Sequence, residues 1–142
     1  MNDNDIEQEI QAKGLTAPRV TPADIEANIA SEHYFTADQG ARHAFLDAFT
    51  GNSPFNPDSF PPLDPALCLL TFCVRVLNNG YTCIGTSACA SPENFDAEIG
   101  RKIAREKAVD DVYAVMGYAL KEQLHVRDIA MQPPLTGSQI AG

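Results

Sequence analysis

The fold is decided by residues 67–90, which read LCLLTFCVRVLNNGYTCIGTSACA. Apolar, β-branched and aromatic residues lie on both sides of the pair Asn79-Gly80. Asn-Gly is typical of a two-residue type I′ turn, because both turn positions need a positive φ. The stretch therefore predicts a β-hairpin with strands at residues 67–78 and 81–89.

A two-residue turn also predicts which residues face one another across the hairpin. Asn78 would pair with Tyr81, so that Val76 would face Cys83 and the register would continue from there. The predicted core face consists of Leu70, Phe72, Val74 and Val76 with Cys83, Gly85, Ser87 and Cys89. The opposite face carries Leu69, Thr71, Cys73, Arg75 and Leu77 with Thr82, Ile84, Thr86 and Ala88. One arginine and three threonines favour an exposed surface for this second face, with an interface or a pocket wall as alternatives.

A long helix is predicted after the hairpin, from the turn that follows Ser91 to about Leu124. Its apolar stripe at helical spacing consists of Ile99, Ile103, Val112, Met116, Leu120 and Leu124. Beside this stripe, Gly100, Ala104 and Ala108 recur every four positions. Small residues let another backbone approach closely, so they predict contact with the sheet or with the helix of a second copy. On this basis we expect at least a dimer.

Three helices are predicted before the hairpin. Residues 1–20 hold a short acidic helix and a linker. The second helix begins at Thr21, an N-cap residue followed by proline, and carries Ile25 and Ile29 on one face. The third helix spans residues 41–49. The sequence thus predicts an α+β fold, in which an antiparallel hairpin or sheet packs with a long C-terminal helix and N-terminal helices are added.

Two segments show no regular pattern. Residues 51–65 contain five prolines and are predicted to form a loop, because proline removes a backbone donor and fixes φ. Residues 131–142 contain proline, glycine and polar residues without a period, and are predicted to be a mobile tail. The whole chain of 142 residues has the length of one domain.

The composition excludes several classes of function. The chain has 10 basic and 19 acidic residues and a net charge of −9, which disfavours DNA or RNA as a partner. No apolar run approaches the roughly 20 residues that span a bilayer, and the acidic N-terminus is unlike a secretory signal, so we expect a cytosolic protein with no membrane partner. The four cysteines and three histidines match no metal-ligand spacing, and we expect no metal and no cofactor, with the cysteines as small buried residues.

Four basic residues, Arg101, Lys102, Arg105 and Lys107, gather at the start of the predicted long helix. They have two interpretations. The first is a solvated helix face with pairs such as Glu98 and Lys102, four residues apart. The second is an anion site, because Arg101 and Arg105 lie one turn apart beside a strand-to-helix turn that offers backbone donors and hydroxyl groups. No catalytic motif accompanies them, and we expect no enzymatic activity.

A family resemblance sharpens this second interpretation. The run NGYTCIGTSACASPENFDAEIGRKIAREKA, followed by GYALKEQL and preceded by GLTAPRVTPADIEANIASEHYFTADQG, is similar to a small phage-protein family that includes the type-one Thoeris anti-defence proteins. The resemblance covers residues 14–40 and 67–124. It implies an α+β homo-oligomer, made in the cytoplasm of the infected bacterial host, that sequesters cyclic nucleotide immune signals without cleaving them. The implied ligands are cyclic ADP-ribose isomers and, in some members, cyclic di- or trinucleotides.

Candidate ligand-binding residues follow from chemistry and position. Arginines suit phosphates, an aromatic ring suits adenine, and hydroxyl or amide groups suit ribose. The candidates are Arg75, Thr86, Ser91, Asn94, Phe95, Arg101, Arg105 and Arg127. The alternative function is a protein-interaction module, because residues 1–66 carry 11 acidic and 3 basic side chains and can dock on a basic host or phage protein.

Overall fold

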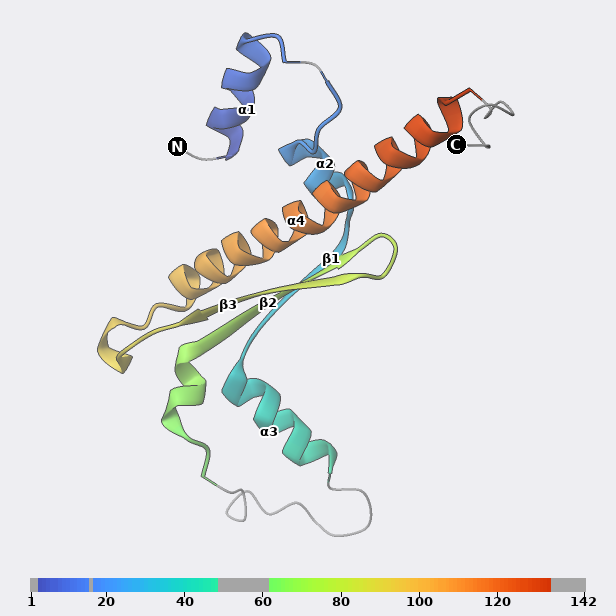
Figure 1. Cartoon of the computed structure of the whole chain (residues 1–142). Coiled ribbons are helices and arrows are strands. Elements are labelled where there is room, and N and C mark those ends of the chain that lie inside the picture. The colour runs from blue at the N-terminus through green and yellow to red at the C-terminus, as the bar shows by residue number, and fades with distance from the viewer. Residues whose placement is uncertain (1–2, 16, 49–61, 134–142) are drawn as a thin grey trace, which may run out of the picture. The chain divides into compact units, whose positions relative to one another are not determined.

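The computed structural model describes residues 3–15, 17–48 and 62–133 (Figure 1). Most of the predicted proline-rich loop and of the predicted tail therefore lies outside the described residues. The chain divides into two compact units, Ala23–Val112 and a second unit formed by Met1–Pro22 with Tyr113–Gly142. The long C-terminal helix α4 (Ala97–Met131) belongs to both units and ends seven residues later than predicted.

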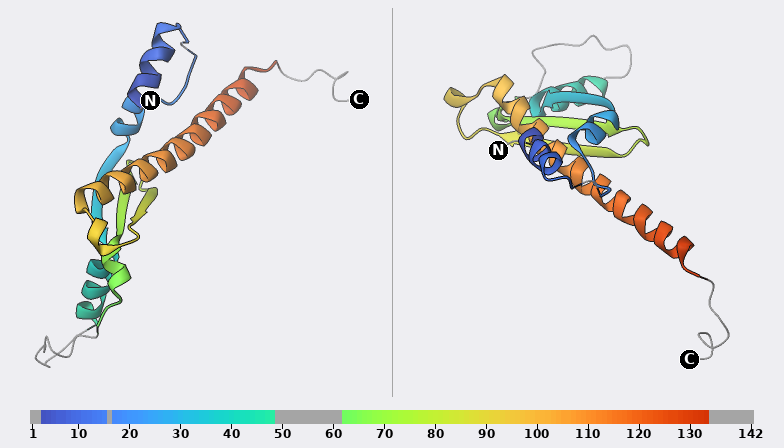
Figure 2. Two further views of the ribbon diagram at one scale, coloured as in Figure 1. Left: turned by 90° about the vertical axis from the view of Figure 1, so that its left-hand side faces the viewer. Right: turned by 90° about the horizontal axis from the view of Figure 1, so that it is seen from above.

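The unit Ala23–Val112 is built around a three-stranded antiparallel sheet in the order β1-β2-β3. Its elements are α2 (Pro22–Ala27), β1 (Ile29–Thr36), α3 (Ala37–Asp47), the 3-10 turn η2 (Pro65–Leu69), β2 (Leu70–Leu77), β3 (Thr82–Ala88), the 3-10 turn η3 (Pro92–Asn94) and the first part of α4. The helix α3 lies beyond the end of the sheet at which β1 ends and β2 begins (Figures 1 and 2). The predicted α+β fold with a long C-terminal helix and N-terminal helices is confirmed.

Strand β1 was not predicted. The second predicted helix ends at Ala27, and Ile29 begins a strand instead of continuing a helical face with Ile25. The segment that follows, ASEHYFT, ends in two aromatic residues and a threonine, which pack well on a pleated surface. The third helix begins at Ala37, four residues before the predicted start.

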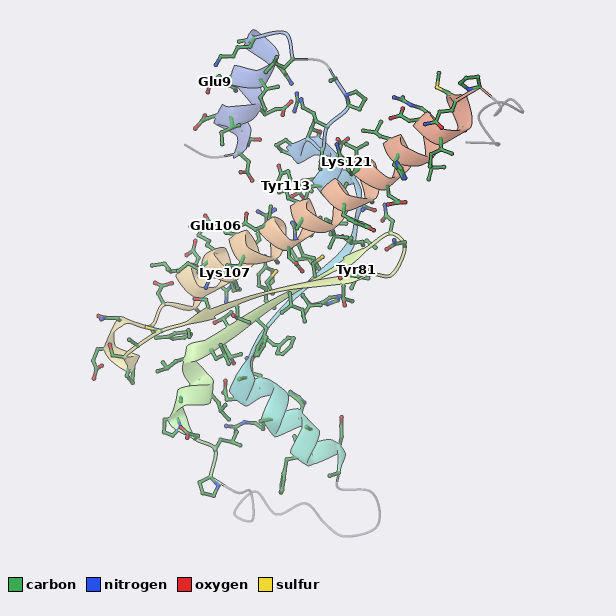
Figure 3. All side chains as sticks on the ribbon, in the orientation of Figure 1. Glu9, Tyr81, Glu106, Lys107, Tyr113 and Lys121 are labelled. Carbon is green, nitrogen blue, oxygen red and sulfur yellow. The ribbon has the colours of Figure 1, made fainter. Side chains whose placement is uncertain are left out.

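The hairpin turn has three residues and not two. The N–H of Leu77 donates to the carbonyl of Tyr81 (2.8 Å), and the N–H of Gly80 donates to the carbonyl of Leu77 (2.9 Å). Of the turn residues only Gly80 has a positive φ, 89°, which matches a type I turn followed by a left-handed glycine. Tyr81, labelled in Figure 3, follows this turn and is half exposed.

The longer turn shifts the register by one residue, so that the side chains of one strand lie on the faces opposite to the predicted ones. Arg75, and not Val76, pairs with Cys83. Because side chains alternate along a strand, every residue of β2 lies on the face opposite to the predicted one relative to β3. The predicted core face is therefore correct for β3 and wrong for β2.

Helix α4 covers one face of the sheet through its small residues. A Cβ atom on Gly85 would lie 1.9 Å from the carbonyl oxygen of Ala104 and 2.4 Å from the nitrogen of Ala108, so the helix backbone touches β3 directly. Figure 2 shows the first part of α4 crossing the strands on one side. The small-residue strip thus contacts the sheet of its own chain, whereas Ile99 and Ile103, predicted to be part of the apolar stripe, are exposed.

The second unit contains α1 (Asp3–Ala12) and the remainder of α4. The carboxylate of Glu7 in α1 accepts hydrogen bonds from both terminal nitrogens of Arg19, the one from Nη2 at 2.6 Å. This pair lowers the pKa of Glu7. The predicted short acidic helix and linker are therefore present, and they are tied together by an ion pair. In the described part of the chain, no helix is long and apolar enough to cross a membrane.

Candidate functional site

A cavity of about 440 Å³ lies at the end of the sheet where β1 ends and β2 begins. Four parts of the chain form it: the end of β1, the first turn of α3, the η2–β2 junction, and the start of α4. Its lining residues are Tyr34, Phe35, Thr36, Asp38, Gln39, Cys68, Thr71, Phe95, Ala97 and Arg101. All of them belong to the unit Ala23–Val112.

The wall formed by β1 and α3 is held by a capping box. The backbone N–H of Thr36 donates to the side-chain oxygen of Gln39 (3.0 Å), and the Thr36 side chain bonds the backbone of Gln39 in return. The Thr36 hydroxyl also donates to Asp38, and this bond lowers the pKa of the Asp38 carboxyl group. The pattern Thr-x-x-Gln is the sequence mark of such a box and would have located the start of α3.

The wall formed by α4 brings together two predicted ligand residues, Phe95 and Arg101. The carboxylate of Asp96 accepts from the N–H of Ile99 (3.0 Å) and so caps the helix start. Arg101 makes no salt bridge with any residue that the structure describes, whereas its neighbour Lys102 pairs with Glu98 at 3.3 Å, as predicted. The cavity therefore combines one uncommitted guanidinium group with aromatic rings from both walls.

Arg105 is committed elsewhere, in a network of two arginines and two glutamates. Its Nη2 lies 3.1 Å from Oε1 of Glu26, and its Nε lies 3.4 Å from Oε1 of Glu32. Arg75 Nη2 lies 3.3 Å from Glu26 Oε1 and 3.1 Å from Glu32 Oε2. The predicted fork of Arg101 and Arg105 is not formed, because Arg105 reaches toward β1 and α2, and only Arg101 lines the cavity.

Arg75 is fully buried between the sheet and α4, against the prediction that its face favours exposure. Its Nε and Nη1 atoms have no hydrogen-bond partner among the described residues. Burial disfavours the ionised Glu32, but the hydrogen bond from Tyr34 and the charges of Arg75 and Arg105 outweigh it and hold the pKa of Glu32 below its usual value. Tyr34 donates this bond, so burial and Glu32 together raise the pKa of Tyr34.

The other predicted ligand residues are not among those that line the cavity. Thr86 is on the face of β3 that α4 leaves open. Asn94 is the last residue of the η3 turn, and its N–H donates to the carbonyl of Ser91 (3.2 Å), the residue that precedes the turn. Arg127 belongs to the second unit. The cavity residues on β1 were missed because no strand was predicted there, and Asp38 and Gln39 were missed because the third helix was predicted to begin only at residue 41.

The cysteines differ in exposure. Cys73 and Cys83 are buried, as predicted, whereas Cys68 is exposed and lies in the cavity wall. Burial and the nearby Asp111 carboxylate raise the pKa of Cys83 to about 11. Among the described residues, no group of His, Cys, Asp and Glu is arranged to hold a metal ion.

The comparison with protein families identifies residues 20–124 with one family model. Its description is the phage protein (N4 Gp49/phage Sf6 gene 66) family. The chain belongs to this family. The match includes the entire unit Ala23–Val112 and hence every residue of the cavity. No curated protein and no solved structure shows significant similarity to the chain.

Proposed function

We propose that this phage-family protein binds and sequesters a cyclic nucleotide immune signal, such as a cyclic ADP-ribose isomer or a cyclic oligonucleotide, without cleaving it. In this proposal it is an anti-defence protein that acts in the cytoplasm of the infected host. The single observation that carries the proposal is that Arg101, which forms no salt bridge with a described residue, lines an aromatic cavity. A protein that only retains its ligand needs such a site and no nucleophile.

The chemistry of the cavity supports a phosphorylated, base-containing ligand. A guanidinium group donates two parallel hydrogen bonds to a phosphate. The rings of Tyr34, Phe35 and Phe95 supply apolar and aromatic surface for a base. The hydroxyl and amide groups of Thr36 and Gln39 lie in the same wall. A volume of about 440 Å³ falls within the range of small-molecule sites and suits one nucleotide unit.

The proposal is tested by incubating the full-length protein with a panel of cyclic ADP-ribose isomers and cyclic di- and trinucleotides. The complex is recovered and heat-denatured, and the released compound is identified by mass spectrometry. We expect one unaltered ligand. A hydrolysed product would instead make the protein an enzyme.

Arg101→Gln is expected to weaken binding of that ligand by about 10- to 100-fold, since a hydrogen bond to a charged group contributes about 1.5–3 kcal/mol. Calorimetric titration measures the loss. Lys102→Gln is the matched control, because Lys102 is the next residue, carries the same charge and does not line the cavity. Equal affinity of Arg101→Gln and the wild type would remove the cavity from the binding site.

The alternative proposal is an acidic protein-interaction module, and it draws on α1. Asp3 and Glu9 are exposed on this helix, and its first turn holds two acidic residues. If the nucleotide panel releases nothing, this helix becomes the candidate docking surface for a basic protein. Deleting residues 1–50 is unsuitable for testing it, because that deletion removes β1 and the whole of α3 as well as α1.

A further inference from the structure

The cavity carries one positive and one negative side chain. Among its lining residues, only Arg101 on α4 and Asp38 on α3 are charged at neutral pH. Desolvation and the Asp38 carboxylate raise the pKa of the Cys68 thiol, and burial together with Glu32 raises the pKa of Tyr34, so both groups stay protonated. The lining of the cavity is therefore neutral as a whole, with its two charges on different walls.

These two charges do not pair with each other. Among the described residues, no salt bridge joins Asp38 to Arg101. The Asp38 carboxylate is held by its own wall, because it accepts hydrogen bonds from the Thr36 hydroxyl and from the N–H of Gln39, and these bonds lower its pKa. A carboxylate that is ionised and fixed in a cavity proposed to bind phosphate must have a ligand group other than phosphate beside it, since like charges repel.

We propose that Asp38 determines the specificity of the cavity by accepting hydrogen bonds from two neighbouring free hydroxyl groups of a ribose, while Arg101 binds a phosphate of the same ligand. This inference rests on the proposed function. The ligand class that it names is a ribonucleotide with an unesterified 2′,3′-hydroxyl pair. An ionised carboxylate has two acceptor oxygens and no donor, so it can accept from both hydroxyls together.

The order of groups within a nucleotide supports this placement. The ribose lies between the phosphate and the base. A phosphate on Arg101 and a base on the aromatic rings of the cavity leave the ribose hydroxyls to the remaining polar wall, which is the wall of Asp38 and Gln39. A cavity of about 440 Å³ has room for one such unit.

The same carboxylate would reject a phosphate on the ribose. In dinucleotide-binding domains of a different fold, an acidic residue binds the free ribose 2′-hydroxyl, whereas a 2′-phosphate is accommodated by an arginine. No second arginine is among the described residues that line this cavity, and Arg105 is committed to Glu26 and Glu32. A phosphate on either ribose oxygen would therefore lie against the Asp38 carboxylate.

The test compares adenosine 5′-monophosphate with adenosine 2′,5′-bisphosphate and adenosine 3′,5′-bisphosphate. Binding of each probe to the full-length protein is measured by ligand-detected NMR titration, which also registers weak binding. We expect the wild type to bind the monophosphate about 10-fold or more tightly than either bisphosphate. In Asp38→Asn, affinity for the monophosphate is expected to fall about 10-fold while affinity for the bisphosphates rises, so that the preference is lost.

These opposite changes separate specificity from folding. Asp38 lies in the first turn of α3, where an acidic residue also favours the helix, but damage to the helix would weaken all three probes alike. Asp47→Asn is the matched control, because Asp47 is an exposed residue of the same helix, has the same charge and does not line the cavity. It is expected to keep the wild-type preference. If circular dichroism shows that Asp38→Asn is not folded, Asp38→Ser, which is also uncharged, replaces it with the same expected effect.

Three results would overturn the inference. They are a wild type that binds the monophosphate and the bisphosphates equally, an Asp38→Asn variant that weakens all three probes by the same factor, and a wild type that binds no adenosine 5′-monophosphate. In each case the proposed function stands if the cyclic nucleotide panel releases an unaltered ligand that Arg101→Gln binds more weakly. A panel that releases nothing makes the proposed function fail as well.

Discussion

The two faces of the sheet differ in which kinds of side chain are buried on them. The face under α4 contains a fully buried arginine, a glutamate, two buried cysteines and a glycine, whereas the opposite face carries the rings of Phe35 and Phe72 and the exposed Ile84 beside a few uncharged polar residues. What decides burial here is the closeness of the helix and not the hydrophobicity of the strand residues. The helix lies so close to β3 that only glycine fits at position 85. The buried charge on this face is that of Arg75, and its ion pair with Glu32 compensates part of it.

The largest expected effect is a loss of folding stability caused by a substitution on the face that α4 covers. In Gly85→Ala, the new Cβ atom would lie 1.9 Å from the Ala104 carbonyl oxygen and 2.4 Å from the Ala108 nitrogen. Both are backbone atoms, so the whole helix must shift, and we expect a loss of about 3 kcal/mol or more, the upper part of the range for overpacking. Urea denaturation measures this change in the free energy of unfolding.

The control for this variant is Gly117→Ala, on α4. A Cβ atom there meets nothing within 4 Å, and alanine favours a helix over glycine by about 0.5–1 kcal/mol, so this change is expected to stabilise the protein. If Gly85→Ala were as stable as the wild type, that result would contradict the close approach of the α4 backbone to β3.

The hairpin could be predicted from the sequence only in part. Its existence, its strands and the long helix after it follow from composition and turn chemistry. The register of the two strands does not follow from them. Asn79-Gly80 can form a two-residue turn or, as here, the last two positions of a three-residue turn in which only Gly80 has a positive φ. A turn that is longer by one residue moves every side chain of β2 to the other face of the sheet. Arg75 was therefore expected on a face that favours exposure, and it lies in the core.

The cavity illustrates a second limit. Phe95 and Arg101 were found because they follow the hairpin closely in sequence. Tyr34 and Phe35 were not, since they precede it by more than thirty residues and reach the site only through pairing of β1 with β2. Such pairing is non-local, and the acidic composition around Ile29 gave no alternating pattern strong enough to predict a strand.

A smaller effect is expected from the charge network on the covered face. Glu32→Gln removes the partner that lies closest to the buried Arg75, at 3.1 Å, and leaves it with Glu26 at 3.3 Å. Removing one partner of a buried pair costs about 3–5 kcal/mol, and because Glu32 keeps a quarter of its side chain exposed we expect about 2 kcal/mol. Glu98→Gln, in the exposed pair with Lys102, is expected to change stability by less than about 0.5 kcal/mol. Equal losses in the two variants would show that Arg75 does not depend on Glu32.

The smallest expected effect is the pH dependence of the same contact. Glu32 has a lower pKa in the folded chain than its ordinary value of 4.5, so near that pH the unfolded chain binds more protons than the folded one. The contribution of Glu32 to stability is therefore complete above pH 4.5 and is lost as the pH falls through the folded pKa. Thermal unfolding of the wild type and Glu32→Gln between neutral and acidic pH should give melting temperatures that converge on acidification.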